Sequence, residues 1–192
     1  LDASELVRKL RITKSPAELA YVRRAGALAD AALRAQVAAA GPGIAEGEVH
    51  AAGHAAIYLG GGDVAASPPV LGAGDRALLV RASTGFGALK AVDQLTLEFA
   101  ASYRRYHACA MRTVAIGEAS ARQRDMFEAT REALEAMTEA VRPGRALGEI
   151  DDAHRRIYDG RGYNHARLAA CGYSLGSTYA PNWMDVPPML YS

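Results

Sequence analysis

The chain has 192 residues, of which 50% are hydrophobic, enough to bury a full core without disulfides or a structural metal. Its 22 Lys and Arg residues balance 21 Asp and Glu residues, which leaves a formal net charge of +1 and no broad basic surface. This balance argues against nucleic acid as a partner.

Cysteine usage and hydropathy favour a cytoplasmic protein. Cys109 and Cys171 lack the spacing of a disulfide scaffold, which is typical of reduced thiols in the cytosol. Charged residues and glycines interrupt every apolar stretch well before the roughly 18 residues that a membrane helix needs. The first ten residues do not have the pattern of a signal peptide. Because the chain begins with Leu1 and ends without a capping element, we expect a fragment of a longer protein.

Two helices are predicted near the start of the chain. Ser15 and Glu18 have the spacing of a capping box, and Pro16 occupies the first helical position. Apolar residues then recur at helical spacing until the Gly-Pro-Gly sequence at 41–43 ends the helix. A second helix is predicted over residues 47–59, before a run of three glycines.

Three stretches that are apolar or alternate in polarity predict strands, at residues 77–80, 95–99 and 109–116. The last two are close enough in sequence to form an antiparallel hairpin. If its turn is centred on Tyr103 and Arg104, Glu98 and Cys109 lie directly opposite each other on one face.

The chain carries an internal repeat. The segments AAGPGIAEGEVHAAGHAAIYLGGG and AVRPGRALGEIDDAHRRIYDGRGY share a Pro-Gly turn, a Glu-Val or Glu-Ile pair, a helix ending in Ile-Tyr and a Gly-rich turn. Pro42 corresponds to Pro143, an offset of 101 residues. We interpret this as two copies of a helix, turn and helix, each followed by strand-like sequence. Chance agreement between Pro-Gly turns is the weaker alternative, because the Glu and Ile-Tyr positions also agree.

The segment EFAASYRRYHACAMRT resembles the metal-binding hairpin of the pita-bread family, which includes Xaa-Pro aminopeptidases, prolidases, methionine aminopeptidases and creatinases. In that family two Asp residues lie eleven positions apart, and the second is followed by x-Thr-Arg-Thr. Here Glu98 and Cys109 occupy the two Asp positions, while Tyr106, Arg112 and Thr113 keep the rest of the pattern.

The resemblance implies an α+β pita-bread fold, in which helices duplicated about a pseudo-two-fold axis surround a curved antiparallel sheet. It implies that residues 1–192 form a single catalytic domain that is truncated at its C-terminus. Members of the family are often homodimers, so we expect a homodimer here.

Metal-dependent members bind two divalent cations such as manganese, using the two Asp residues, a His in Gly-His-x-x-Gly and two later Glu residues. In GYSLG, Tyr173 stands where that His belongs. Glu98 is longer than Asp by a methylene, Cys109 favours softer metals, and a phenol with a pKa near ~10 is a poor ligand at neutral pH. We therefore expect no bound metal and no other cofactor, with the two cations as the alternative.

The sequence is most similar to the metal-free branch, which contains creatinase and ectoine hydrolase. The pieces LEFAASYRRYHAC and GYSLGSTYAPNW carry the similarity to ectoine hydrolases. A metal-free hydrolase activates water with a side chain, and Glu98 is the candidate general acid or base. His107 and His165 are candidate bases or substrate-orienting groups, with a structural role as the alternative for each. Tyr173 is a candidate hydrogen-bond donor to the substrate.

Three further residues are candidate substrate contacts. Cys109 is also a candidate nucleophile, although the chain has no Cys-His motif and an inert thiol is the favoured interpretation. Arg112 is suited to hold a substrate carboxylate, with a structural ion pair as the alternative. Trp183 is suited either to line a small apolar pocket or to pack in the core.

The sequence therefore predicts a hydrolase that cleaves a C–N bond of a small amide or amidine, as ectoine hydrolase does, without a dinuclear metal site. The first alternative is a metal-dependent Xaa-Pro aminopeptidase or dipeptidase with a dipeptide-like substrate. The second alternative is a non-catalytic binding module on the same fold.

Overall fold

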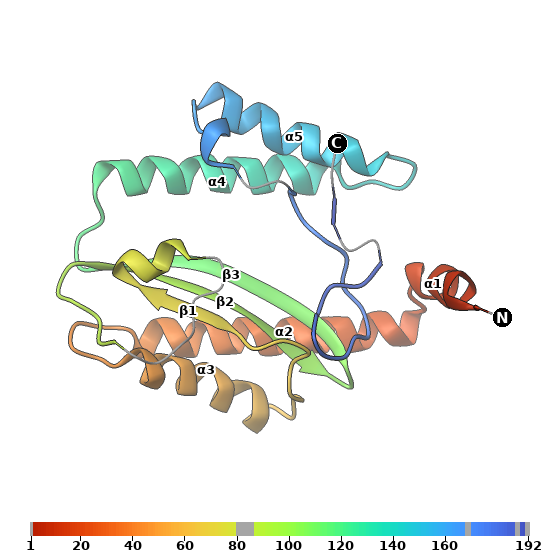
Figure 1. The fold of residues 1–192 in the computed structure, drawn as a ribbon, viewed down its shortest axis with the longest axis horizontal. Helices are drawn as coiled ribbons and strands as arrows, with labels where there is room; N and C mark the ends of the chain where they lie inside the picture. Colours follow the sequence, from red (N-terminus) through yellow and green to blue (C-terminus); the bar gives the residue numbers. More distant parts are fainter. Residues whose placement is uncertain (1, 80–86, 168–169, 187–188, 191–192) are drawn as a thin grey trace. The chain divides into compact units, whose positions relative to one another are not determined.

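The computed structural model describes residues 2–79, 87–167, 170–186 and 189–190 (Figure 1). The chain divides into two compact units, Leu1–Glu118 with Leu175–Asp185 and Ala119–Ser174 with Val186–Ser192. Each unit contains one copy of the predicted repeat. The assignment of the whole chain to a single catalytic domain stays a prediction. Within the described ranges, none of the helices combines the length and the apolar character needed to cross a bilayer.

The first unit begins with three helices: α1 (Ser4–Ile12), α2 (Pro16–Ala39) and α3 (Glu46–Leu59). The predicted capping box starts α2, because Ser15 Oγ accepts from the backbone N–H of Glu18 and the Glu18 carboxylate accepts from that of Ser15. The predicted second helix is confirmed and begins one residue earlier than expected. Helix α1 was not among the predicted elements.

An antiparallel sheet of three strands follows, in the order β1 (Val70–Ala73), β2 (Asp93–Tyr103) and β3 (Tyr106–Ile116). The predicted strand at 77–80 is wrong over its described residues, because Gly74–Leu78 form a 3₁₀ helix, η1. Gly74 turns the chain with a φ of 58°, and Thr96 Oγ1 donates to the carbonyl oxygen of Ala77 at 2.9 Å. Val80 lies outside the described residues.

The hairpin of β2 and β3 turns one residue later than predicted. Arg104 and Arg105 occupy its centre with φ values of 51° and 67°, as a two-residue turn of type I′ requires. The register therefore pairs Glu98 with Met111 and Ala100 with Cys109. The predicted direct opposition of Glu98 and Cys109 is wrong, but the shift of two positions keeps both residues on the same face of the sheet.

Contacts outside the hairpin hold Arg105 in this conformation. Its backbone N–H donates to Asp63 Oδ2 at 3.1 Å. Its guanidinium donates to the carbonyl oxygens of Val64 and Thr178 at 2.6 Å and 3.2 Å. These interactions join distant parts of the first unit and offset the cost of a left-handed backbone at a residue other than glycine.

The helices α2 and α3 cover one face of this sheet (Figure 1). Phe99 and Ala101 of β2 are buried there against Leu28 and Ala32 of α2 and Ile57 of α3. Because side chains alternate along a strand, the neighbouring residues of β2 and β3 point to the opposite face. That face carries the candidate site.

The second unit pairs α4 (Ala121–Ala140) with α5 (Leu147–Gly160), and the short 3₁₀ helix η2 (Asn164–Ala166) follows. These helices confirm the second copy of the repeat, including the break at Pro143 and Gly144. Arg161 joins them through an ion pair with Asp125 at 2.9 Å and another with Glu132. Within the described part of the second unit, the strand-like sequence after this copy contributes one isolated bridge, between Gly172 and Leu190.

Candidate active site

The hairpin brings Glu98, His107 and Cys109 to one face of the sheet. Cys109 is paired with Ala100, so it lies diagonally across the hairpin from Glu98, two residue pairs further along the ladder. Both Glu98 and Cys109 are partly buried. A carboxylate and a thiol thus lie close together, on strands that a continuous ladder of eleven pairs holds in place.

His107 is fully buried and both of its ring nitrogens have partners. The backbone N–H of Ala66 donates to Nε2 at 3.0 Å, which requires Nε2 to carry no proton. The proton is therefore on Nδ1, which donates to Thr178 Oγ1 at 3.1 Å. Burial lowers the pKa of His107 below its ordinary value, so the ring is neutral at pH 7. Because its lone pair is already used by Ala66, this geometry favours the structural alternative for His107 over the role of a base.

Arg112 lies on the other face of the hairpin from Glu98, since it is paired with Leu97. Its side chain is exposed, and Nη1 donates to the carbonyl oxygen of Met111 at 2.7 Å. The register therefore separates Arg112 from Glu98 and Cys109. Its predicted contact with substrate stays a prediction, as does that of Trp183, which is buried at 6% exposure in the 175–185 segment.

The remaining two candidates belong to the second unit. His165 is exposed within η2, and Tyr173 is partly buried next to the bridge formed by Gly172. Their predicted roles beside Glu98 stay predictions.

The structure adds Asp185, which no sequence pattern selected. Its carboxylate is buried and forms ion pairs with Arg11 at 2.7 Å and Lys14 at 3.0 Å. Gly176 packs against it, because a Cβ at that position would lie 2.0 Å from Asp185 Oδ2. The carbonyl oxygen of Gly176 accepts from the backbone N–H of His107 at 3.1 Å. The second glycine of GYSLG is therefore needed to seat this segment against β3.

The model of metallopeptidase family M24 matches residues 20–189. This chain belongs to family M24. It is 33% identical over 186 residues to an uncharacterized hydrolase/peptidase of Sinorhizobium fredii, a match that covers 95% of this chain and 47% of the relative.

Two named relatives of this M24 chain represent both predicted branches. It is 26% identical over 172 residues to the Xaa-Pro dipeptidase of Pyrococcus furiosus, covering 90% of this chain and 49% of that protein. It is 28% identical over 193 residues to the ectoine hydrolase of Halomonas elongata, covering 95% and 48%. The predicted membership in a family of hydrolases with Xaa-Pro peptidase and ectoine hydrolase relatives is confirmed.

Solved structures confirm the pita-bread fold. The prolidase from Pyrococcus furiosus superposes with a TM-score of 0.89 at 24% identity, covering 97% of this M24 chain and 54% of the prolidase. The dipeptidase PepE from Mycobacterium ulcerans gives a TM-score of 0.85 at 25% identity, covering 96% and 50%. The chain thus spans about half the length of the relatives that it matches, so the predicted truncated fold is confirmed.

Membership in a metallopeptidase family implies a metal site. The ligand chemistry of the side chains on the hairpin face shows whether they fit such a site. Glu98 supplies a hard carboxylate, whereas Cys109 supplies a soft thiolate, which manganese and other hard divalent cations do not favour. Within the described residues, no three His, Cys, Asp or Glu side chains are grouped to hold an ion. The donors at this hairpin therefore do not fit a pair of hard cations.

Proposed function

We propose that the protein containing this chain hydrolyses a C–N bond in a small amide or amidine, with Glu98 as general acid and base. The observation that carries the proposal is the placement of Glu98 beside Cys109 on one face of the hairpin. A carboxylate there is suited to proton transfer, and the thiol next to it is a poor partner for a hard cation.

The chemistry requires one proton to move twice. The Glu98 carboxylate takes a proton from water as the water oxygen attacks the carbonyl or amidine carbon. It then gives that proton to the nitrogen as the C–N bond breaks, so the carboxylate is regenerated. In this proposal Tyr173 donates a hydrogen bond to the intermediate and His165 helps to orient the substrate. Similarity to the ectoine hydrolase of Halomonas elongata supports a small substrate of this kind.

A metal-dependent Xaa-Pro aminopeptidase or dipeptidase is the second candidate. Similarity to the Xaa-Pro dipeptidase of Pyrococcus furiosus, and the family itself, favour it. In that case Glu98 is one ligand of a site that holds divalent cations such as manganese, and the substrate is dipeptide-like. A homodimer and a cytoplasmic location are further parts of the proposal for either candidate.

Metal dependence separates the two candidates. The full-length protein is purified, its bound metal is measured by mass spectrometry, and hydrolysis of ectoine and of an Xaa-Pro dipeptide is followed with and without a chelator. We expect cleavage of the small cyclic substrate to survive chelation. Strong inhibition by the chelator that manganese reverses, with cleavage of the dipeptide alone, would overturn the proposal in favour of the peptidase.

A further inference from the structure

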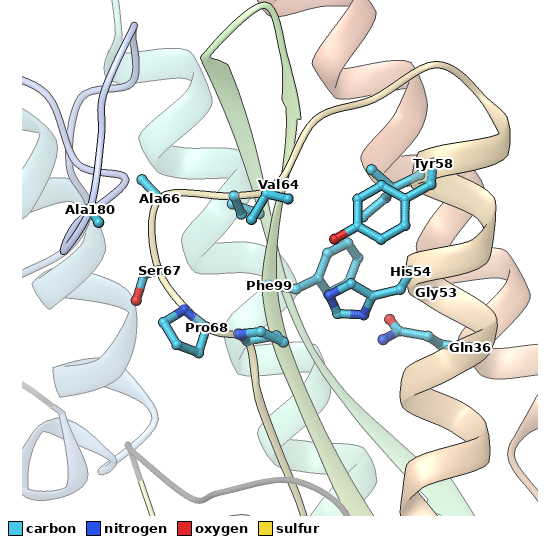
Figure 2. Close-up of a pocket in the computed structure, with 14 residues that line it drawn as sticks. Gln36, Gly53, His54, Tyr58, Val64, Ala66, Ser67, Pro68, Phe99 and Ala180 are labelled. Atoms are coloured by element: carbon cyan, nitrogen blue, oxygen red, sulfur yellow. The ribbon is translucent and has the colours of Figure 1, made fainter.

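A cavity of about 250 Å³ lies beside β2 in the first unit, and its lining includes Phe99 and Ala100 but not Glu98. Figure 2 shows Gln36, His54 and Tyr58 from the helices on one side and the loop carrying Val64 and Pro68 on the other. Phe99 also lines the cavity, and its side chain points away from the face of the sheet that holds Glu98. The lining does not include Glu98, His107 or Cys109, although Ala66, which donates to His107, is shared with the candidate site.

The sheet edge is open where β2 passes this cavity. Pairing with β1 ends at Glu98, and the next cross-strand contact on that edge is the bridge between Asp63 and Ser102. Ser102 directs its carbonyl oxygen to this edge, where it accepts from the backbone N–H of Asp63 at 2.8 Å. Since backbone groups alternate in direction along a strand, Ala100 directs its N–H and its C=O to the same edge.

Ala100 lines the cavity, and it has no strand partner on this edge among the described residues. The chain opposite it contains Pro68 and Pro69, which have no backbone N–H to donate. Within the residues that the structure describes, a backbone donor and acceptor of a central strand are therefore left unpaired, and both are strong hydrogen-bonding groups.

Gln36 supplies a second unpaired group. Its side chain is 3% exposed, and its buried Oε1 has no hydrogen-bond partner in the described structure. Gly53 makes room for it, since a Cβ at that position would lie 2.7 Å from Cδ of Gln36. Figure 2 shows the amide head of Gln36 directed toward the cavity, next to His54 and Phe99. A buried amide oxygen without a partner costs about 1–3 kcal/mol in a folded protein, so a bound donor would relieve it.

We propose that this cavity binds a small, uncharged ligand that carries secondary amide groups. The N–H of one ligand amide donates to the C=O of Ala100, and the C=O of the next ligand amide accepts from the N–H of Ala100, as in an added strand at an open sheet edge. A further N–H of the ligand donates to Gln36 Oε1. Apolar parts of the ligand contact Phe99 and Ile57, which line the same space.

Size and charge define the ligand class. A volume of about 250 Å³ corresponds to about eight water molecules at ~30 Å³ each, so the ligand has on the order of ten heavy atoms. Among the described residues, the lining contains no carboxylate, ammonium or guanidinium group, which disfavours a charged ligand. An N-acetylated amino acid amide meets both conditions.

The test uses N-acetylglycine N-methylamide as the probe. It is titrated into isotopically labelled protein, and chemical shifts are followed by NMR. We expect saturable shifts at millimolar concentrations in the backbone amide of Ala100, the side-chain amide of Gln36 and the ring of His54, with none in α4 or α5. N-acetylsarcosine N,N-dimethylamide, which has the same carbonyl groups but no N–H, is expected to bind at least tenfold more weakly.

Gln36→Leu removes the buried oxygen with little change in volume. We expect it to raise the dissociation constant of the probe at least tenfold, whereas Asn164→Leu, which removes an exposed amide outside the cavity, leaves it unchanged. Equal binding of the two compounds, an unchanged constant in Gln36→Leu, or no saturable shift at these positions would each overturn the proposal. The comparison of the two compounds in the unmodified protein stands even if the variant does not fold. Because this comparison measures binding alone, a negative result does not bear on the proposed hydrolysis.

Discussion

The imidazole of His107 accepts a hydrogen bond of 3.0 Å from the backbone of Ala66, 41 residues earlier in the chain. Through Nδ1 the same ring forms a hydrogen bond with Thr178, 71 residues later. One buried side chain therefore joins the loop before β1, the hairpin and the 175–185 segment. His107 therefore acts on the candidate site by holding the backbone of these three segments in place.

His107→Ala is expected to destabilise the protein by about 2–4 kcal/mol, because it removes two buried hydrogen bonds and leaves a cavity. Urea denaturation measures the change. His107→Gln, whose side chain also offers a donor and an acceptor, should recover part of the loss. An alanine variant with unchanged stability but abolished turnover would identify His107 as a catalytic residue instead.

Glu98→Gln is expected to lower kcat/KM by at least a hundredfold, because the amide cannot accept the proton that general base catalysis requires. The assay uses the full-length protein with the small cyclic substrate. Circular dichroism serves as the folding control, since the partly buried side chain changes little in size. Full activity of this variant would show that Glu98 is not the general acid or base.

Cys109→Ser is the matched control on the same face of the hairpin. If the thiol is inert, this variant should keep activity within a few-fold of the unmodified protein, and alkylating reagents should have little effect. A loss as large as that of Glu98→Gln would show that the thiol acts in the reaction.

Asp185→Asn is expected to lower the free energy of unfolding by about 3–5 kcal/mol. The buried carboxylate is paired with Arg11 and Lys14, and its neutralisation leaves two cations without their counterion. Urea denaturation again gives the change, and limited proteolysis should show faster cleavage near α1. The exposed pair of Arg8 and Glu5, at 3.0 Å, is the control, and Glu5→Gln should cost less than about 1 kcal/mol.

Acid is expected to destabilise the first unit through His50. Burial, and then the charge of His54, lower the pKa of His50 from 6.5 to about 4. Between these values the unfolded state binds a proton that the folded state does not, so stability falls as the pH decreases from about 6.5 to about 4. The shift corresponds to at most about 3 kcal/mol, and partial exposure of the ring reduces this to about 1–2 kcal/mol.

Urea denaturation at pH 7 and pH 4.5 tests this window. His50→Gln should lose less stability over this range than the unmodified protein does, because glutamine does not titrate. Arg34→Gln, a change at an exposed position, should leave the pH dependence unchanged. An identical loss in His50→Gln and in the unmodified protein would assign the acid sensitivity to other groups, such as His107.

Local sequence determined the helices of the repeat and the family. Ser15, Pro16 and Glu18 set the start of α2 because capping depends on residues within one turn of each other. The Pro-Gly turns ended both long helices for an equally local reason. The spacing of Glu98, Tyr106, Cys109 and Arg112 was sufficient to identify the family, because a hairpin motif keeps its sequence spacing even when its side chains change.

Tertiary contacts decided what the sequence left open. Arg104 and Arg105 carry no turn signal of their own. Asp63 and Thr178 hold the left-handed backbone of Arg105, so only the folded chain fixed the register of Glu98 and Cys109. The same holds for His107, because the two hydrogen bonds of its neutral ring are made to residues 41 and 71 positions away. Sequence patterns report interactions within a few residues, whereas burial and the pairing of polar groups are set by segments that meet only after folding.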